Sequence, residues 1–519
     1  MRWEIIYKGT VFVAEEMGIE LKRSALSPNI RERMDHSCAI LDKEGKIVAQ
    51  AEHIPVHLGS FRIGVKNLID LIKKEKIVLE EGDMIIINDP YIAGTHLNDI
   101  MVFAPVYWKN EIAGYVVNKA HQVDVGGPSP GSINPRATTI YEEGIIIPAV
   151  KLIKKGLLDE DVVKIMSSNF KTPDVTMGDL HAQLASNRTG INRVQDLFQK
   201  YGVKQVHLAW VESMKHATNL ILSEIKNWPK GKFEDEDYLE WDDELIPIHA
   251  SISVSEKEIS VDFTGTSPQV NAPLNAVFGV TYSAVAFAIR SMLKGDIPTN
   301  EGLYRVLNVK APPNSLINPV SPFPVAGGNL ETSQRVADVM FKVLSHILPE
   351  RVSSAGSGTM MSLIMGGPRE EGGFWSYYET IGGGTGGRPC KSGVSGVHVN
   401  MTNTLNTPIE VAERTYPLLY TSYAIRSGSG GKGEYDGGDS IIRSFKSRKT
   451  SRVSILGERF KLKPWALQGG EPGLPGKVTI NRDTGNSENL PSKFTAELNS
   501  NDEVVIETPG GAGWGKIKK

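Results

Sequence analysis

Residues 84–124 carry the strongest fold and site signals in the chain, and they read MIIINDPYIAGTHLNDIMVFAPVYWKNEIAGYVVNKAHQVD. Three segments rich in Val and Ile, at 84–89, 101–108 and 112–119, have the composition of β-strands. The loop-like segments beside them carry histidines and carboxylates: His96 and Asp99 in one, His121 and Asp124 in the other. The pattern predicts a sheet with candidate functional residues at the ends of its strands.

Outward from this stretch, the pattern alternates between strands and helices. Residues 38–50 predict a hairpin around KEG, and 251–267 predict another around SEKE. Helical spacing of apolar residues recurs in several further segments. These segments are 3–26, 60–76, much of 158–222, 284–294 and 332–348.

Glycine is concentrated near the C-terminal end, since 19 of the 83 residues from Gly356 to Gly438 are glycine. Such a region requires turns and close approaches of the backbone. We therefore predict an α+β, multi-domain fold with an N-terminal metal-site unit, a helical middle and a glycine-rich, β-containing C-terminal part. The predicted units are an N-terminal α/β unit at 1–155, a helical segment at 156–240, an α/β unit at 241–355 and the glycine-rich part at 356–519.

Composition excludes several classes of protein. The 519 residues include 57 Lys and Arg against 60 Asp and Glu, so the net charge of -3 gives no basic footprint for nucleic acid. The longest uncharged stretch, 263–289, is interrupted by polar residues, so it lacks the run of about 18 apolar residues that a membrane-spanning helix needs. Two cysteines, Cys38 and Cys390, form no disulfide framework, and no signal peptide is evident at the start, so we expect a cytoplasmic protein.

Five of the eleven histidines fall within the first 121 residues, at positions 36, 53, 57, 96 and 121. His96 and His121 with one or two carboxylates make a nitrogen and oxygen donor set that suits Mn, Fe or Zn. Asp35 is a candidate for a further oxygen ligand, and His57 lines a site or caps a loop. The alternative is that these histidines only hold loops by hydrogen bonds, and the HxxD spacing alone does not decide between the two.

Motifs for other chemistry are weak. The segments 382–387 and 428–433 satisfy GxGxxG, but no helical pattern follows either, so both are better interpreted as glycine turns. No segment matches GxxxxGK[ST] or GxSxG, and Cys38 lies in an apolar run typical of a core residue. Four arginines are candidate carboxylate clamps, although surface pairing is the default for each. These are Arg31, Arg33, Arg335 and Arg388.

Six long blocks, taken together, resemble the hydantoinase B/5-oxoprolinase B family, which is related to the large subunits of acetone carboxylases. They occur in the family's order and extend over nearly the whole chain. The blocks are SPNIRERMDHSCAILDKEGKIVAQAEHIPVHLGS at 27–60, NDPYIAGTHLNDI at 88–100, KAHQVDVGGPSPGS at 119–132, FTGTSPQVNAPLNAV at 263–277, FPVAGGNLETSQRVADV at 323–339 and TPGGAGWG at 508–515.

The resemblance implies the B subunit of an ATP-dependent cyclic amidohydrolase of the 5-oxoprolinase or N-methylhydantoinase type. It implies a separate hydantoinase A-type subunit that binds ATP and activates the ring by phosphorylation, and hence a hetero-oligomer. It also implies a divalent metal, Mn or Zn and possibly Fe, held by His96, Asp99 and His121. Asp35 is the less secure fourth ligand, and Asp124 orients a ligand or, like His57, takes the proton from the attacking water.

Two other functions stay open. One is a subunit of an ATP-dependent ketone carboxylase, which bicarbonate-dependent ATP turnover would reveal. The other is a non-catalytic scaffold for an ATP-using partner, against which a loss of activity in His121→Ala with the complex intact would argue. The sequence identifies neither the cyclic amide nor the metal.

Overall fold

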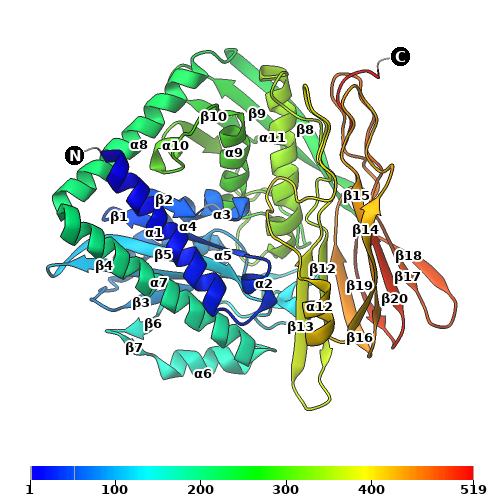
Figure 1. Cartoon of the computed structure of the whole chain (residues 1–519), viewed down its shortest axis with the longest axis horizontal. Helices are drawn as coiled ribbons and strands as arrows, with labels where there is room; N and C mark the ends of the chain where they lie inside the picture. The colour runs from blue at the N-terminus through cyan, green and yellow to red at the C-terminus, as the bar shows by residue number, and fades with distance from the viewer. Residues whose placement is uncertain (1–2, 52, 518–519) are drawn as a thin grey trace.

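The computed structural model describes residues 3–51 and 53–517. It is a mixed α+β structure, as the sequence predicts, and it has four β-sheets. The N-terminal and central residues build a helix-covered body, and the C-terminal sheets lie beside it (Figure 1). None of the described helices is both long and apolar enough to span a membrane.

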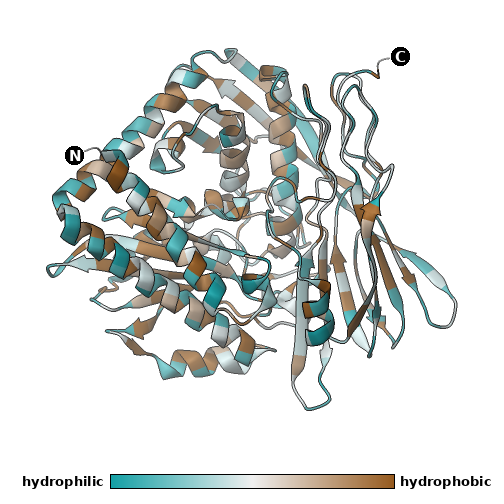
Figure 2. Cartoon of the chain, viewed as in Figure 1, coloured by the Kyte–Doolittle hydropathy of each residue, from teal (hydrophilic) through white to brown (hydrophobic). Residues whose placement is uncertain are grey.

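The first sheet has seven antiparallel strands in the order β2-β1-β5-β4-β3-β6-β7. Its strands are β1 (His36–Asp42), β2 (Ile47–Ala51), β3 (Met84–Ile87), β4 (Asp99–Trp108), β5 (Glu111–His121), β6 (Val150–Lys154) and β7 (Leu157–Leu158). The predicted hairpin at 38–50 is confirmed by pairing of β1 with β2. The inner strands are hydrophobic over most of their length because both faces are covered (Figure 2).

Helices cover this sheet. α1 (Trp3–Ser24) and α7 (Pro173–Tyr201) lie side by side across it, and α8 (Val203–Ile225) packs against both (Figure 1). The shorter α6 (Glu160–Asn169) precedes α7, which confirms the helical spacing expected over much of 158–222. The predicted helical segment at 156–240 also contains strand residues, at 157–158 and 231–240. α4 (Ser60–Glu75) also matches its prediction, and it packs against α5 (Pro90–Ala93) and α9 (Phe278–Met292). Two single-turn helices, α2 (Pro28–Arg31) and α3 (Pro55–Leu58), hold residues of the site described below.

A second sheet has the order β11-β10-β9-β8, in which β10 and β11 are parallel and the other neighbours antiparallel. The predicted hairpin at 251–267 is confirmed by β9 and β10. A π-helical turn at Gly328–Thr332 leads into α11, which packs on β8 and β9. The elements of this part are β8 (Gly231–Trp241), β9 (Glu244–Val254), β10 (Ile259–Asp262), α9 (Phe278–Met292), α10 (Glu301–Tyr304), β11 (Leu307–Lys310) and α11 (Ser333–Ile347).

Two antiparallel sheets form the C-terminal part, in the orders β13-β12-β16-β19 and β14-β15-β20-β17-β18. Their elements are β12 (Ser362–Pro368), β13 (Phe374–Thr380), α12 (Ile409–Thr415), β14 (Leu418–Arg426), β15 (Ser440–Ser447), β16 (Ser451–Leu456), β17 (Lys477–Asn481), β18 (Ser487–Leu490), β19 (Lys493–Leu498) and β20 (Glu503–Glu507). Residues from these strands make a core of their own, from Met361 to Ile506. A larger core begins at Ile6, holds the N-terminal and central elements together, and takes in a few residues of the C-terminal part, such as Ile364, Tyr378 and Leu456.

The glycine-rich segments cross each other at very close range. A Cβ built on Gly384 would lie 1.8 Å from the carbonyl oxygen of Gly438, and one on Gly511 would lie 1.9 Å from that of Thr385. Backbone hydrogen bonds join the same segments, such as Gly438 N–H to Thr385 and Gly511 N–H to Gly438. Only residues without a side chain allow backbones to pack so closely, which explains why glycine is concentrated there.

Six buried charged side chains connect the second sheet, α11 and the C-terminal part. Arg335 lies 2.7 Å from Asp338 and 3.2 Å from Glu458. Arg459 lies 2.7 Å from both Asp237 and Asp338, and Lys493 lies 2.6 Å from Glu458. Three cations therefore match three carboxylates. We refer to these six residues as the buried ionic network.

Candidate active site

The hairpin of β4 and β5 brings three of the predicted residues together. Asp99 begins β4 and His121 ends β5, and the two residues are direct partners in the ladder. His96 lies three residues before Asp99, and its Nδ1 is 3.0 Å from Asp99 Oδ2. The rings of His96 and His121 are 4.9 Å apart between centroids. The strand pairing thus places two imidazoles beside one carboxylate.

His57 of α3 reaches the same carboxylate. Its Nε2 lies 3.3 Å from Asp99 Oδ2, and its Nδ1 lies 3.0 Å from the hydroxyl of Ser37. Burial works to raise the pKa of Asp99, but His96 and then His57 hold that pKa well below its ordinary value. Asp99 is therefore an ionised carboxylate between two histidines.

A small enclosed cavity of about 20 Å³ lies at this cluster. We call it the histidine cavity. Its volume has room for about one water molecule. Its walls come from α3, from the ends of the first sheet, from the π-helical turn and from β13 and the loop after it. The lining residues are Asp35, Ile54, Val56, His57, Asp99, His121, Asn329, Leu330, Met360, Tyr378, Thr380, Thr402 and Thr404.

Asp35 lines the histidine cavity at the start of β1, as a neighbour of the other predicted ligands. Burial raises the pKa of Asp35, while the nearby Arg33 opposes the shift. The structure therefore brings His57, His96, Asp99, His121 and Asp35 into one cluster.

His121 is held on two sides. The carboxamide of Asn29 contacts its Nδ1 at 3.0 Å and donates to its carbonyl oxygen at 2.6 Å. The ring of Tyr378 stacks on it at 4.5 Å, with planes 8° apart. Burial, reinforced by His96, holds the pKa of His121 well below its ordinary value. The imidazole is thus neutral, the form in which histidine ligates metals.

The donor atoms at the site are of the types that ligate divalent metals. Nε2 of His96, Nε2 of His121 and Oδ1 of Asp99 are buried and have no hydrogen-bond partner. Within the described residues, however, no group of three or more His, Cys, Asp or Glu side chains is already arranged to hold a metal ion. A metal would require these donors to turn toward one point.

Asp124 lies outside the histidine cavity. Its carboxylate accepts from the N–H groups of Gly126 at 2.8 Å and Gly131 at 3.1 Å and from the Ser376 hydroxyl at 3.0 Å. Lys171 forms an ion pair with it at 3.3 Å. These contacts tie the loop after β5 to α7 and β13.

Three further sequence candidates, His36, His53 and Cys38, lie apart from the cluster. The rings of His36 and His53 contact each other edge-on at 5.0 Å, and neither lines the histidine cavity. Cys38 is buried beside Ser186, and burial raises the pKa of its thiol to about 12, so it is a core residue as predicted.

Sequence reasoning missed several residues that shape the site. Asn29 and Tyr378 hold His121, and Thr380 and Thr404 line the cavity from far along the chain. The sequence could have indicated Lys119 as a neighbour of the site, because it precedes His121 by two residues on a strand and therefore points to the same face of the sheet. Burial lowers the pKa of Lys119 to about 8, with Asp99 opposing the shift.

A family model for hydantoinase B/oxoprolinase matches residues 1–517. The chain belongs to the hydantoinase B/oxoprolinase family. It is 48% identical to an uncharacterized protein of Methanocaldococcus jannaschii over 99% of this chain and 90% of that protein. It is 36% identical to 5-oxoprolinase 1 of Arabidopsis thaliana over 97% of this chain but only 41% of that enzyme. A Pseudomonas protein named as the B-type chain of a D-/L-hydantoinase is 32% identical, over 97% of this chain and 88% of the relative.

Two solved structures share the fold. The ATP-dependent caprolactamase of Pseudomonas jessenii superposes with a TM-score of 0.91 at 26% identity, over 99% of this chain and 90% of that chain. A nucleotide-free acetone carboxylase superposes with a TM-score of 0.91 at 17% identity, over 99% of this chain and 75% of the other. The second likeness shows the fold alone. The relatives that carry the name of an activity thus include 5-oxoprolinase, a hydantoinase chain and an ATP-dependent caprolactamase.

Proposed function

We propose that this chain is the B-type subunit of an ATP-dependent cyclic amidohydrolase that opens a lactam or hydantoin ring. The observation that carries the proposal is the convergence of His57, Asp99, His121 and Asp35 on one enclosed cavity, with His96 against Asp99. The 5-oxoprolinase and caprolactamase relatives support the class of substrate.

His96, Asp99 and His121 are the proposed ligands of a divalent metal, Mn or Zn and possibly Fe, with Asp35 as a fourth oxygen ligand. Their unpartnered nitrogen and oxygen atoms support this assignment. When bound, such an ion lowers the pKa of a water and stabilises an oxyanion. The contacts of Asn29 and Tyr378 fix the ring of His121, as expected for a metal ligand whose other nitrogen is engaged.

His57 is the better placed of the two proposed general bases. It lines the histidine cavity, and Ser37 and Asp99 orient both of its ring nitrogens. To accept a proton from water, His57 releases one of these contacts. Asp124 would have to give up an ion pair and several hydrogen bonds to do the same, so we assign it the weaker claim.

ATP is proposed to bind to a hydantoinase A-type partner in a hetero-oligomer, where it phosphorylates the amide oxygen. The glycine segments of this chain support that division. Most of the glycines at 382–387 and 428–433 lie against other backbone segments, such as Gly384 against Gly438 and Gly387 against Tyr435, which leaves little room for a nucleotide. We place the complex in the cytoplasm, on the basis of two cysteines that are both free thiols.

The test is glutamate release from 5-oxoproline with ATP, using this chain mixed with an A-type partner. We expect release that needs both chains and is lost in His121→Ala while the complex stays intact. Release that survives His121→Ala would remove the metal assignment and leave the scaffold role. If 5-oxoproline is not opened, hydantoins and other lactams are tried next, and ATP turnover that depends on bicarbonate would instead identify a ketone carboxylase.

A further inference from the structure

Lys119 is a fully buried lysine on β5, and its ammonium contacts two segments that lead to the histidine cluster. It donates to the hydroxyl of Ser60 at 3.1 Å and to the carbonyl oxygen of Ala93 at 3.0 Å. Both acceptors are neutral. A charge buried against neutral acceptors lacks the compensation that an ion pair gives, which points to a role other than stability.

The contact with Ser60 leads to His57. Ser60 begins α4, and its hydroxyl donates in turn to the carbonyl oxygen of His57 at 3.1 Å. Ser37 of β1, which contacts Nδ1 of His57 at 3.0 Å, is the direct cross-strand partner of Lys119. Cross-strand partners lie on the same face of a sheet. Lys119 and Ser37 therefore fix the backbone and the ring of His57 from one face.

The contact with Ala93 leads to His96. Ala93 is the last residue of α5 and precedes His96 by three residues. Its carbonyl group packs on α4 at Gly64, where an added Cβ would overlap the carbonyl oxygen. The close packing of α4 and α5 thus brings both acceptors within reach of one ammonium. The contact fixes the start of the segment that carries His96.

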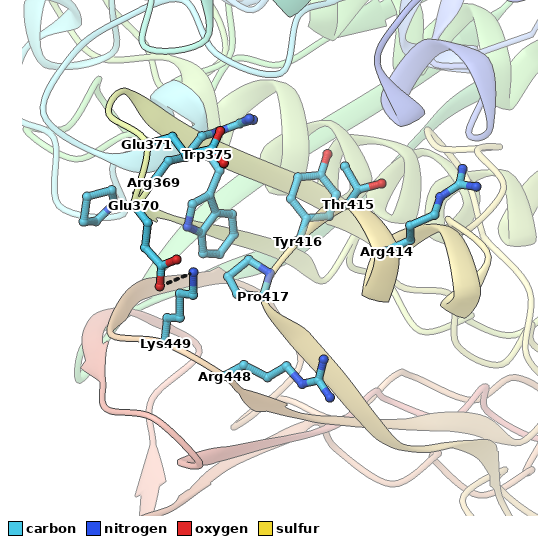
Figure 3. A pocket seen from close by; sticks show the side chains of 11 residues that line it. Arg369, Glu370, Glu371, Trp375, Arg414, Thr415, Tyr416, Pro417, Arg448 and Lys449 are labelled. Atoms are coloured by element: carbon cyan, nitrogen blue, oxygen red, sulfur yellow. Dashed lines mark ion pairs between the residues drawn. The ribbon is translucent and has the colours of Figure 1, made fainter.

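Two other lysines show how this chain normally places an ammonium. Lys493 is also buried, but it pairs with Glu458 at 2.6 Å. Lys449 lines an open surface pocket of about 370 Å³ and pairs with Glu370 at 2.8 Å (Figure 3). Both cations meet a carboxylate, whereas the hydrogen bonds of Lys119 join two segments of the candidate active site.

We propose that Lys119 is a positioning residue, whose ammonium holds the segments of His57 and His96 at fixed places relative to His121. The inference rests on the proposed function, because these histidines are its proposed base and ligands. Lys119 is not one of the residues that line the histidine cavity, so it acts through them. Since β5 carries both Lys119 and His121 on one face, a single strand sets the positions of all three rings.

The first experiment measures Zn²⁺ binding to the full-length chain by competition with a chromophoric chelator. We expect Lys119→Met to weaken the affinity by about tenfold or more, as the loss of a group that orients metal ligands does. Removing a positive charge would by itself strengthen Zn²⁺ binding, so a weaker affinity reports positioning. Lys493→Met and Lys449→Met are the buried and exposed controls, and both should keep the wild-type affinity. Unchanged or tighter binding by Lys119→Met overturns the proposal.

Hydrogen exchange of the metal-free chain tests the two contacts directly. In Lys119→Met, the amides of 55–60 and 93–97 should exchange faster by about tenfold or more, because their local opening costs less free energy. Ser60→Ala keeps the ammonium and should affect 55–60 alone. Equal acceleration of both segments in Lys493→Met would reveal a general loss of stability and overturn the proposal. If Lys119→Met does not fold, Ser60→Ala decides, and unchanged exchange at 55–60 overturns it.

Because neither measurement requires turnover, the outcome is independent of the ring-opening assay. A wild type that binds no Zn²⁺, but in which exchange at both segments depends on Lys119, would refute the proposed metal ligands alone. A chain that opens a ring and binds Zn²⁺ equally well in Lys119→Met would refute this inference alone.

Discussion

The buried ionic network and the histidine cavity are both clusters of buried ionisable groups, but they differ in how their charges are matched. Both contain buried atoms without a partner, which in the network are Nε of Arg335 and Nε of Arg459. In the network each charge faces an opposite charge at 2.6–3.2 Å. In the cavity His96, Asp99 and His121 each keep a buried polar atom with no partner. Matched charges hold parts of a fold together, whereas unmatched atoms are costly unless something binds to them. The contrast separates structure from function within one chain.

Arg335→Met tests the structural side and has the largest expected effect. Removing the guanidinium leaves Glu458 and Asp338 with one cation each in a buried environment, so the free energy of unfolding falls by about 3 kcal/mol or more. Denaturant unfolding measures it. The control is Lys66→Met, which breaks the exposed pair with Asp70 and should have a far smaller effect, because water screens both charges. Equal losses in the two variants would contradict the distinction.

Metal addition tests the functional side. Mn²⁺ or Zn²⁺ at one hundred times its dissociation constant should stabilise the chain by about 2.7 kcal/mol, because only the folded state holds the ligands together. The stabilisation should vanish in His96→Gln. Thermal unfolding with and without the ion measures it. An increment that persists in His96→Gln would place the metal elsewhere, and a wild type indifferent to both ions would remove it.

Asp124→Asn tests whether Asp124 has a structural or a catalytic role. We expect a loss of about 2 kcal/mol in unfolding free energy, since Lys171 loses its counter-ion and two N–H groups lose a charged acceptor. Metal affinity and the pH profile of activity should be unchanged. A shifted pH profile with unchanged stability would instead make Asp124 the general base.

Glu331→Gln tests a pH-dependent contribution to stability beside the buried ionic network. Burial, reinforced by Glu458, raises the pKa of Glu331 from 4.5 to about 8. Between these two values the folded chain binds a proton that the unfolded chain has released, so stability falls as pH rises. The fall is up to about 1.4 kcal/mol per pH unit. Unfolding at pH 5 and pH 8 should show a smaller difference in Glu331→Gln, and an unchanged difference would exclude this carboxyl as its source.

The sequence predicted many of the local elements, because these depend on short-range patterns, and it named residues that the structure gathers at the histidine cavity. The metal ligation assigned to those residues stays a prediction. The β4–β5 hairpin follows from two Val-rich runs, and its pairing alone puts Asp99 opposite His121. It did not predict Tyr378 or Thr404, whose approach depends on how the C-terminal part docks. Nor did it separate Asp124 from the cluster, since a loop three residues beyond His121 carries no signal of its direction. The four candidate arginines were equivalent in the sequence until burial separated Arg33 and Arg335, which are fully buried, from Arg31 and Arg388.

The histidine cavity is closed by residues distant in sequence, and this has a consequence for synthesis. The loop that carries Thr402 and Thr404 docks on the N-terminal part through Leu405 N–H to Arg33 and Val56 N–H to Met401. At about 5–20 residues per second, a ribosome needs roughly 15–60 s after His121 emerges to deliver that loop. During that interval the histidines and Arg33 of the nascent chain are not covered by this loop and are accessible to metal ions and chaperones. The histidine cavity thus closes only after the loop that carries Thr402 and Thr404 has left the ribosome.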